Sequence, residues 1–284
     1  MRYSFDVTVG PVGFRIGSAS RQPIVSLTAL YAGYPRAPIP DFTVRLEPPR
    51  PWRRLIRPSV AIKGDHILPE AVPLPLAQGL LAAEMGMNLQ VALGERRFLL
   101  LHAASVERDG RALILTGESG SGKSTLSALL GASGWRFMGD EFVLIEPATG
   151  MAFPFPRPVS LKNESIAALG AILPDDQFGP ILKGTPKGDI RHLRPAATAI
   201  ARMHEPAKPA LILFPSFGPA REVRDVAISE AFVRLTQAST NYFALGEPGF
   251  VALTRLVTTV PARAIDYPDT ATALSLVEDL WRAL

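Results

Sequence analysis

A glycine-rich segment at residues 117–124 constrains the fold of this 284-residue chain more than any other stretch. It reads Gly-Glu-Ser-Gly-Ser-Gly-Lys-Ser and fits the phosphate-binding pattern G-x-x-x-x-G-K-[ST] at every fixed position. Glycines let backbone N–H groups curl around phosphate oxygens, and the positive end of a following helix attracts the same anion. An apolar run at 112–116 precedes the segment and leucines at helical spacing follow it. The sequence therefore predicts a strand, a phosphate loop and a helix, in that order.

This phosphate loop predicts ATP and Mg²⁺ as cofactors. Lys123 can reach the β- and γ-phosphates, and the Ser124 hydroxyl is placed to ligate Mg²⁺. The nucleotide-binding residues predicted in and beside the loop are Gly117, Glu118, Ser119, Gly120, Ser121, Gly122, Lys123, Ser124 and Thr125.

A histidine is predicted to lie at the mouth of the loop. The apolar run 98–106 leads to Asp109-Gly110, a dipeptide suited to a tight hairpin turn, and 112–116 returns. With these two residues as the turn, Val106 faces Leu113 and His102 faces Gly117. A histidine in an apolar strand is either a hydrogen-bonded core residue or a functional group, and both interpretations stay open.

Two adjacent carboxylates, Asp140 and Glu141, interrupt the otherwise apolar strand predicted at 135–145. A phosphate loop needs an acid to orient Mg²⁺, and a kinase also needs a base for the proton of its acceptor hydroxyl. We predict that Asp140 joins Ser124 at the metal and that the pair divides these two tasks. The alternative is a structural ion pair at a strand end. Asp140 follows Lys123 by only 17 residues, a spacing that most phosphate-loop NTPases do not show.

Two further cations are candidate phosphate contacts. Arg157 stands between two prolines, so its stiff backbone can present the guanidinium to a phosphate or to a carboxylate. Lys187 belongs to residues 174–195, which are predicted to form a long loop with glycines beside cations. Such a loop is either a lid over a triphosphate or a solvated basic loop.

Composition excludes several classes of protein. The chain is 47% hydrophobic and 20% charged, as in globular proteins, and its lack of cysteine excludes disulfides and thiolate metal sites. Its start has no apolar region typical of a secretory signal, and the apolar stretch 71–83 contains prolines and is too short to span a bilayer. The net charge of +4 is mild and scattered. We expect a cytoplasmic protein without a nucleic-acid or membrane partner.

The chain is predicted to contain two domains. Residues 1–72 form a small β-rich module with short strands at 3–9, 12–16, 42–46 and 59–62, and it serves either as a substrate platform or as a structural cap. Trp52, Arg53, Arg54 and Arg57 within it either bind a partner or form a solvated basic edge.

Residues 73–284 form the second predicted domain, which contains the phosphate loop. Helices are predicted at 76–93, 164–173, 230–238, 249–258 and 270–284, and strands at 210–214 and 262–267. Asn241 and Glu247 are assigned no role.

The run Leu101-His102-Ala103-Ala104, the phosphate loop and Gly139-Asp140-Glu141 together resemble the HPr kinase/phosphorylase family. The similarity is greatest to the HPr-kinase-related branch found with peptide-modification systems. It implies an α/β fold: a kinase core with a mixed sheet flanked by helices, of the type shared with phosphoenolpyruvate carboxykinases. The family acid pair is usually Asp-Asp, so Glu141 leaves open which carboxylate is the base. The family's later R-G-x-G signature is missing, which argues against a phosphorylase reaction and against HPr as the substrate.

These observations predict an ATP- and Mg²⁺-dependent kinase that phosphorylates a hydroxyl, with serine of a peptide or small protein as the expected acceptor. Lys123, Asp140 and Glu141 are the predicted catalytic residues, and His102 positions or tunes the acids. Two alternatives remain: a nucleotide-gated peptide-binding module without transfer activity, and a kinase of a small metabolite. A homo-oligomer is compatible with the sequence.

Overall fold

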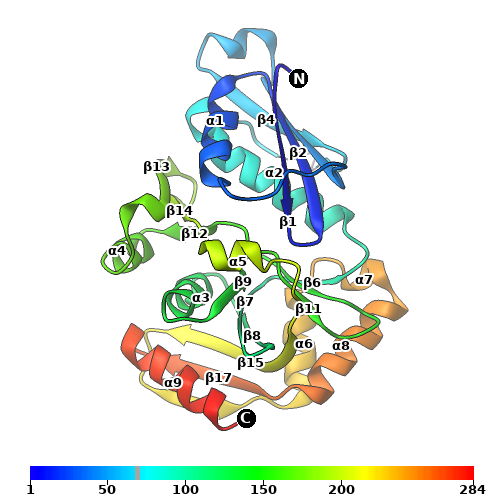
Figure 1. Cartoon of the computed structure of the whole chain (residues 1–284), viewed down its shortest axis with the longest axis vertical. Coiled ribbons are helices and arrows are strands. Elements are labelled where there is room, and N and C mark those ends of the chain that lie inside the picture. Colours follow the sequence, from blue (N-terminus) through cyan, green and yellow to red (C-terminus); the bar gives the residue numbers. More distant parts are fainter. Residues whose placement is uncertain (68–70) are drawn as a thin grey trace.

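The computed structural model describes residues 1–67 and 71–284, and these residues form a mixed α/β structure with four β-sheets (Figure 1). An N-terminal sheet with two helices lies above a six-stranded sheet in Figure 1. Two three-stranded sheets complete the architecture. The predicted α/β class is confirmed at this level.

The N-terminal sheet has the order β1-β2-β3-β4-β5. Its strands are β1 (Tyr3–Val9), β2 (Val12–Ser18), β3 (Phe42–Glu47), β4 (Ser59–Gly64) and β5 (Leu74–Pro75). Strands β2 and β3 are parallel, which requires a crossover connection, and α1 (Arg21–Leu30) supplies it. The sequence-based prediction of strands alone in this region missed α1, although Ile24, Leu27 and Leu30 recur at helical spacing and are buried.

Helix α2 (Gly79–Gly94) packs against β3 and β4, so Leu80, Met87 and Val91 share one core with Val44 and Leu46 of β3. The boundary between residues 72 and 73 stays a prediction. Helix α2 follows this boundary in the sequence, but it packs on the sheet formed mainly by residues that precede the boundary. Residues 68–70, which the predicted apolar stretch 71–83 follows directly, lie outside the described residues.

The six-stranded sheet has the order β16-β17-β15-β8-β7-β9. Its strands are β7 (Ala103–Arg108), β8 (Arg111–Thr116), β9 (Arg136–Gly139), β15 (Lys208–Phe217), β16 (Glu222–Asp225) and β17 (Ala262–Tyr267). Strands β8, β15 and β17 are parallel to one another. Their carboxyl ends therefore lie at one edge of the sheet, where ligands bind in open α/β folds.

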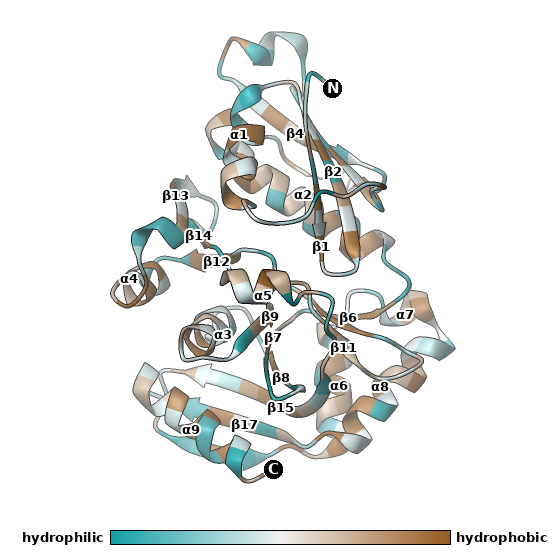
Figure 2. Cartoon of the chain, in the orientation of Figure 1, coloured by the Kyte–Doolittle hydropathy of each residue, from teal (hydrophilic) through white to brown (hydrophobic). Residues whose placement is uncertain are grey.

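Helices cover both faces of this sheet. Because side chains alternate along a strand, Leu113 and Leu115 of β8 pack with α3 (Lys123–Ala132) and α9 (Thr270–Arg282), whereas Ile114 packs with α6 (Ile228–Ala238) and α8 (Glu247–Thr259). Helix α9 shows hydrophilic and hydrophobic residues side by side in Figure 2, as expected of a surface helix that buries one face.

The two small sheets lie beside the phosphate loop. One contains β6 (Leu99–Leu101), β10 (Val143–Ile145) and β11 (Ala152–Phe153), and the other contains β12 (Val159–Lys162), β13 (Phe178–Thr185) and β14 (Gly188–Leu193). The remaining elements are α4 (Glu164–Gly170), α5 (Ala197–Ala201), α7 (Tyr242–Leu245) and the short 3₁₀ turns η1 (Pro51–Arg54), η2 (Leu76–Gln78) and η3 (Asp175–Gln177).

The long loop predicted at 174–195 is wrong for residues 178–193, which form the antiparallel hairpin of β13 and β14. Leu182 and Ile190 are buried in the core shared with the N-terminal sheet, and Phe178 and Leu193 in the core with α3. The glycines that suggested hinges serve the turn, because Gly188 has a φ of +85°.

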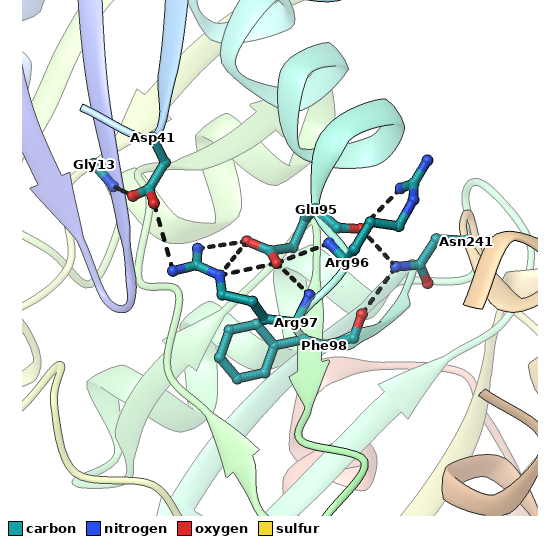
Figure 3. A network of polar contacts seen from close by, with 7 residues as sticks. All are labelled: Gly13, Asp41, Glu95, Arg96, Arg97, Phe98 and Asn241. Atoms are coloured by element: carbon teal, nitrogen blue, oxygen red, sulfur yellow. Dashed lines mark hydrogen bonds and ion pairs between the residues drawn. The ribbon is translucent and has the colours of Figure 1, made fainter. Parts of the chain in front are cut away.

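A polar network joins the N-terminal sheet to the strand that leads into His102 (Figure 3). The Glu95 carboxylate accepts hydrogen bonds from the Arg97 guanidinium, which also approaches Asp41 at 3.5 Å. The Asn241 amide donates to the carbonyls of Glu95 and Phe98 at 3.1 and 2.9 Å. Asn241, which received no role from the sequence, is buried and holds the start of β6 in place.

Candidate functional site

Three strand ends bring the predicted site residues to one edge of the six-stranded sheet. Strand β8 ends at Thr116, directly before the phosphate loop, and β9 ends at Gly139, directly before Asp140. Strand β7 lies between them and runs in the opposite direction, so its first residue, Ala103, pairs with Thr116. His102 therefore lies at the same edge.

The predicted hairpin register is confirmed: Val106 pairs with Leu113 and Arg108 with Arg111. The predicted continuous strand 98–106 is interrupted at His102, where the chain passes from β6 to β7. The facing strand is interrupted at the same level, between Gly139, which pairs with Ser105, and Val143, which pairs with Leu101. The acid pair and the histidine occupy these two interruptions.

The phosphate loop has the backbone that its glycines allow. Gly120 and Gly122 have φ values of +88° and +95°, and Gly122 directly precedes α3. A side chain at Gly122 would meet the hydroxyl of Tyr267, which lies 3.4 Å from the carbonyl oxygen of Ser121. Strand β17 thus supports the loop from one side, and the first turn of α3 presents its N–H groups to it.

Lys123 is buried beneath the loop. Its Nζ donates hydrogen bonds to the carbonyls of Gly117 and Glu118, both at 2.7 Å. Burial lowers the pKa of this ammonium, and the negative charges of Asp140 and Glu141 oppose that effect. The lysine is therefore held at the mouth of the loop, where a phosphate would meet it.

Asp140 is the most perturbed acid of the site. Burial, and secondarily the charge of Glu141, raise its pKa to about 7 against the opposing effects of the Ser124 hydroxyl, Lys162 and Lys123. Its Oδ1 is buried and has no hydrogen-bond partner among the residues that the structure describes. A buried carboxylate oxygen without a partner is costly unless a cation or a donor completes it.

Glu141 and His102 are more accessible. The His102 Nε2 lies 3.9 Å from the Glu141 Oε2, and the side chains are 59% and 32% exposed, respectively. The His102 backbone N–H donates to the carbonyl of Ala238 at 2.7 Å, which ties it to the end of α6. Partial burial lowers the imidazole pKa, against the effect of Glu141, and Lys123 also lowers it. With 59% of its side chain exposed, His102 is not a core residue.

Lys162 is a site residue that sequence reasoning missed. It ends β12, and a 2.8 Å hydrogen bond between the hydroxyls of Thr125 and Ser165 holds the following residues against the first turn of α3. The positive charge of Lys162 acts on the pKa values of Asp140, Lys123 and His102. The sequence did not indicate that Lys162 lies near the loop, because its position depends on the pairing of β12 with β14.

Lys187 lies in the exposed turn between β13 and β14, and its charge lowers the pKa of His102. It stays a candidate phosphate contact. Thr125, predicted as a nucleotide contact, instead directs its hydroxyl to Ser165.

Arg157 does not join the phosphate contacts. It is buried, and its guanidinium donates to Tyr31 at 3.2 Å, to Asn88, and to both the carbonyl and the carboxylate of Glu84. The structure thus corrects the prediction of a phosphate contact in favour of the carboxylate alternative. The ion pair links α2 to the segment before β12.

Replacing Arg157 with methionine is expected to lower the free energy of unfolding by about 3–5 kcal/mol, because it leaves Glu84 buried without a counter-charge. Urea denaturation measures the change. The double variant with Glu84→Gln should recover part of the loss, and Arg36→Met, at an exposed arginine, is the matched control. A loss no larger than that of the control would contradict the structural role.

A cavity of about 740 Å³ adjoins the loop on the α6 side of the sheet. It is large enough for a small-molecule ligand. Residues from the loop, from helix α6 and from strands β8, β15, β16 and β17 line it, among them His102, Gly117, Lys123, Ser216, Arg224 and Asp266. Of these, Ser216, Arg224 and Asp266 were not singled out from the sequence, because they meet the loop only when β15, β16 and β17 are in place.

The residues present fit a magnesium ion. Mg²⁺ in phosphate-transfer sites is held by one or two carboxylates or hydroxyls together with substrate phosphates, rather than by a cage of protein ligands. Ser124 and Asp140 offer that set, and the unpartnered Asp140 Oδ1 is a ready ligand. In residues 1–67 and 71–284 no group of three or more His, Asp or Glu side chains is placed to hold a metal on its own.

No protein-family model matches the chain, and no curated protein matches it. Among solved structures, the chain is similar to the Hpr(Ser) kinase/phosphatase from Coxiella burnetii, with 15% sequence identity and a TM-score of 0.29, over 65% of this chain and 94% of that chain. A likeness this remote assigns neither a family nor an activity. Among the described helices, none is both long and apolar enough to cross a membrane.

Proposed function

We propose that the chain is an ATP- and Mg²⁺-dependent kinase that transfers a γ-phosphoryl group to a hydroxyl, with serine of a peptide or small protein as the acceptor. The observation that supports this most directly is the meeting of Lys123, Ser124 and the acid pair at one sheet edge, with Asp140 buried and its Oδ1 unpartnered among the described residues. A module that only bound nucleotide would need no second carboxylate there.

Binding and charge neutralisation belong to the loop. Its backbone N–H groups and Lys123 hold the β- and γ-phosphates and stabilise the charge of the transferring group. Ser124 and Asp140 would hold Mg²⁺, which would supply positive charge to offset that of the phosphates. Lys162 and Lys187 add positive charge that acts on His102.

Proton transfer is assigned to Glu141. Asp140 is buried beside Ser124, whereas Glu141 is half-buried and can reach an acceptor. The acceptor oxygen forms a bond to the γ-phosphorus as the bond from that phosphorus to the β,γ-bridging oxygen breaks. The hydroxyl proton passes to the Glu141 carboxylate, and ADP leaves. The His102 Nε2 lies 3.9 Å from this carboxylate, close enough to position it through a small shift of either side chain.

Glu141→Gln is expected to lower kcat by about a hundredfold with unchanged ATP affinity, near the lower end for a general base because phosphoryl transfer depends mainly on positioning and electrostatics. Rapid-quench kinetics and nucleotide titration measure the two quantities. Glu247→Gln, at an exposed acid that begins α8 and has no assigned role, is the matched control. Full activity in Glu141→Gln would move the base to another residue.

Lys162→Ala is expected to raise the pKa of Asp140, because one of the charges that favour its ionised form is lost. The lower limb of the pH profile of kcat/KM should therefore shift to higher pH. Lys162→Arg should restore it, and Lys183→Ala, at an exposed lysine of β13, should leave the profile unchanged. An unshifted profile in Lys162→Ala would remove this residue from the site.

The direct test combines purified protein, Mg-ATP and serine-containing peptides, followed by mass spectrometry for an added phosphate. Transfer to a hydroxyl supports the proposal. Tight ATP binding with the triphosphate left intact beside peptide and metabolite acceptors would support the nucleotide-gated binding module instead.

A further inference from the structure

The turn between β3 and β4 exposes large apolar side chains. We name residues 50–57 the arginine turn. It contains η1, none of whose residues is buried. Trp52 is 52% exposed, Leu55 87% and Ile56 65%. Three neighbouring apolar side chains of this size in solvent form a patch of the kind that marks an interaction site, unlike a single exposed leucine.

Four arginines surround this patch: Arg50, Arg53, Arg54 and Arg57. Within the described part of the chain none of them forms an ion pair, and the sequence has no acid between Glu47 and Asp65. The Arg50 guanidinium lies 5.3 Å from the centroid of the Trp52 ring, and Arg53 donates to the carbonyl of Arg57. Neither contact neutralises charge, so the turn attracts anions.

The backbone of the turn is restricted. Pro51 and Pro58 restrict the backbone at both ends, and Arg57 has a φ of +46°, which makes the return to β4 sharp. Trp52 belongs to η1, and Leu55 follows the last residue of that helix directly. In Figure 1 this light-blue segment forms the upper end of the molecule, remote from the phosphate loop.

We propose that the arginine turn docks the protein on an anionic phospholipid surface. A bilayer surface needs no pocket for docking, and the turn lies at one end of the molecule in Figure 1. Trp, Leu and Ile side chains enter the interfacial region, while arginines keep their charges at the phosphates. This differs from the expectation of no membrane partner, because the sequence alone did not show that these apolar side chains face solvent. A surface contact requires no spanning segment.

Tryptophan fluorescence gives a built-in readout. Of the three tryptophans, Trp135 and Trp281 are buried against each other, with ring centroids 4.7 Å apart, and Trp52 is exposed. Vesicles of phosphatidylcholine mixed with phosphatidylglycerol should shift the emission to the blue and reduce iodide quenching. Phosphatidylcholine vesicles alone should do neither, and raised salt should weaken the effect.

Vesicle sedimentation of variants distinguishes the contribution of the arginine turn to binding from that of the protein's net charge. Each arginine at such a surface contributes about fivefold in affinity, so Arg53→Gln with Arg54→Gln should weaken binding about 30-fold. Leu55→Ser should weaken it further and reduce the blue shift. Arg221→Gln with Arg282→Gln, on two exposed arginines near α9, makes the same change of charge and should leave affinity within about twofold.

Three results would overturn the proposal: no binding to the anionic vesicles by the folded protein, equal losses in the two double variants, or an unchanged Trp52 signal on binding. Binding to poly-glutamate without vesicle binding would assign the turn to an acidic polypeptide. A change of sedimentation coefficient with Leu55→Ser, without vesicle binding, would assign it to a second copy of the chain.

Discussion

Lys123→Ala is expected to abolish measurable ATP binding and to lower phosphoryl transfer by at least about a thousandfold, at the upper end for loss of one charge-stabilising group. The lysine is buried at the loop, so its loss removes a cation that bulk solvent replaces poorly. The two 2.7 Å bonds to the Gly117 and Glu118 carbonyls are lost as well, and the loop loses part of its support.

Isothermal titration with Mg-ATP and the peptide kinase assay check this expectation. Lys183→Ala removes the same charge from an exposed position on β13 and should behave as the unmodified protein. Retained ATP affinity in Lys123→Ala, with circular dichroism unchanged, would mean that the nucleotide binds elsewhere, for example in the cavity beside α6.

Asp140→Asn is expected to lower transfer by about a thousandfold or more, because weakened metal binding removes several kcal/mol of charge stabilisation. Raised Mg²⁺ concentration should recover part of the activity. Asp109→Asn changes the same group in the exposed hairpin turn at the other end of β7 and β8, so it should have a much smaller effect and serves as the control.

The same variant should be more stable than the unmodified protein when Mg²⁺ is removed with EDTA. The pKa of Asp140 is raised from 3.8 to about 7, so the folded state keeps a proton that the unfolded state releases. Stability therefore falls as the pH rises through that window. At about 1.4 kcal/mol per pKa unit, the ionised carboxylate costs up to about 4 kcal/mol above neutral pH.

Thermal unfolding at pH 8 and at pH 5 tests this sign. The midpoint of Asp140→Asn should exceed that of the unmodified protein at pH 8, and the difference should shrink at pH 5. A lower midpoint at pH 8 would show that Asp140 stabilises the metal-free fold, which is the behaviour of an ion-paired acid.

The parts of the site that were predicted from sequence depend on local rules. The order of strand, loop and helix around Lys123 follows from a motif of eight residues and its flanks. The register that places His102 follows from one two-residue turn. In both cases neighbours in sequence decide the geometry, and long-range packing adds little.

The parts that were missed depend on contacts between distant segments. Lys162 ends β12, whose partner strand β14 was expected to belong to a loop, and its charge acts on Asp140. Asn241 binds carbonyls about 140 residues earlier in the chain. Arg157 had two possible partners in sequence, and only the position of α2 decided between them. The kinase family predicted for the chain also stays a prediction, and it rests on the residues of the loop and the acid pair.

The matching interruptions at His102 and at residues 140–142 have a consequence for how the site works. Paired strands flank each interruption on both sides, so the backbones that carry His102 and the acid pair are held at both ends. The spacing between these side chains is therefore set during folding, before any substrate binds. The site then needs little reorganisation during the reaction. A single-residue deletion in either strand would shift the register of the paired strands on one side of the interruption. A side-chain substitution could not restore that register.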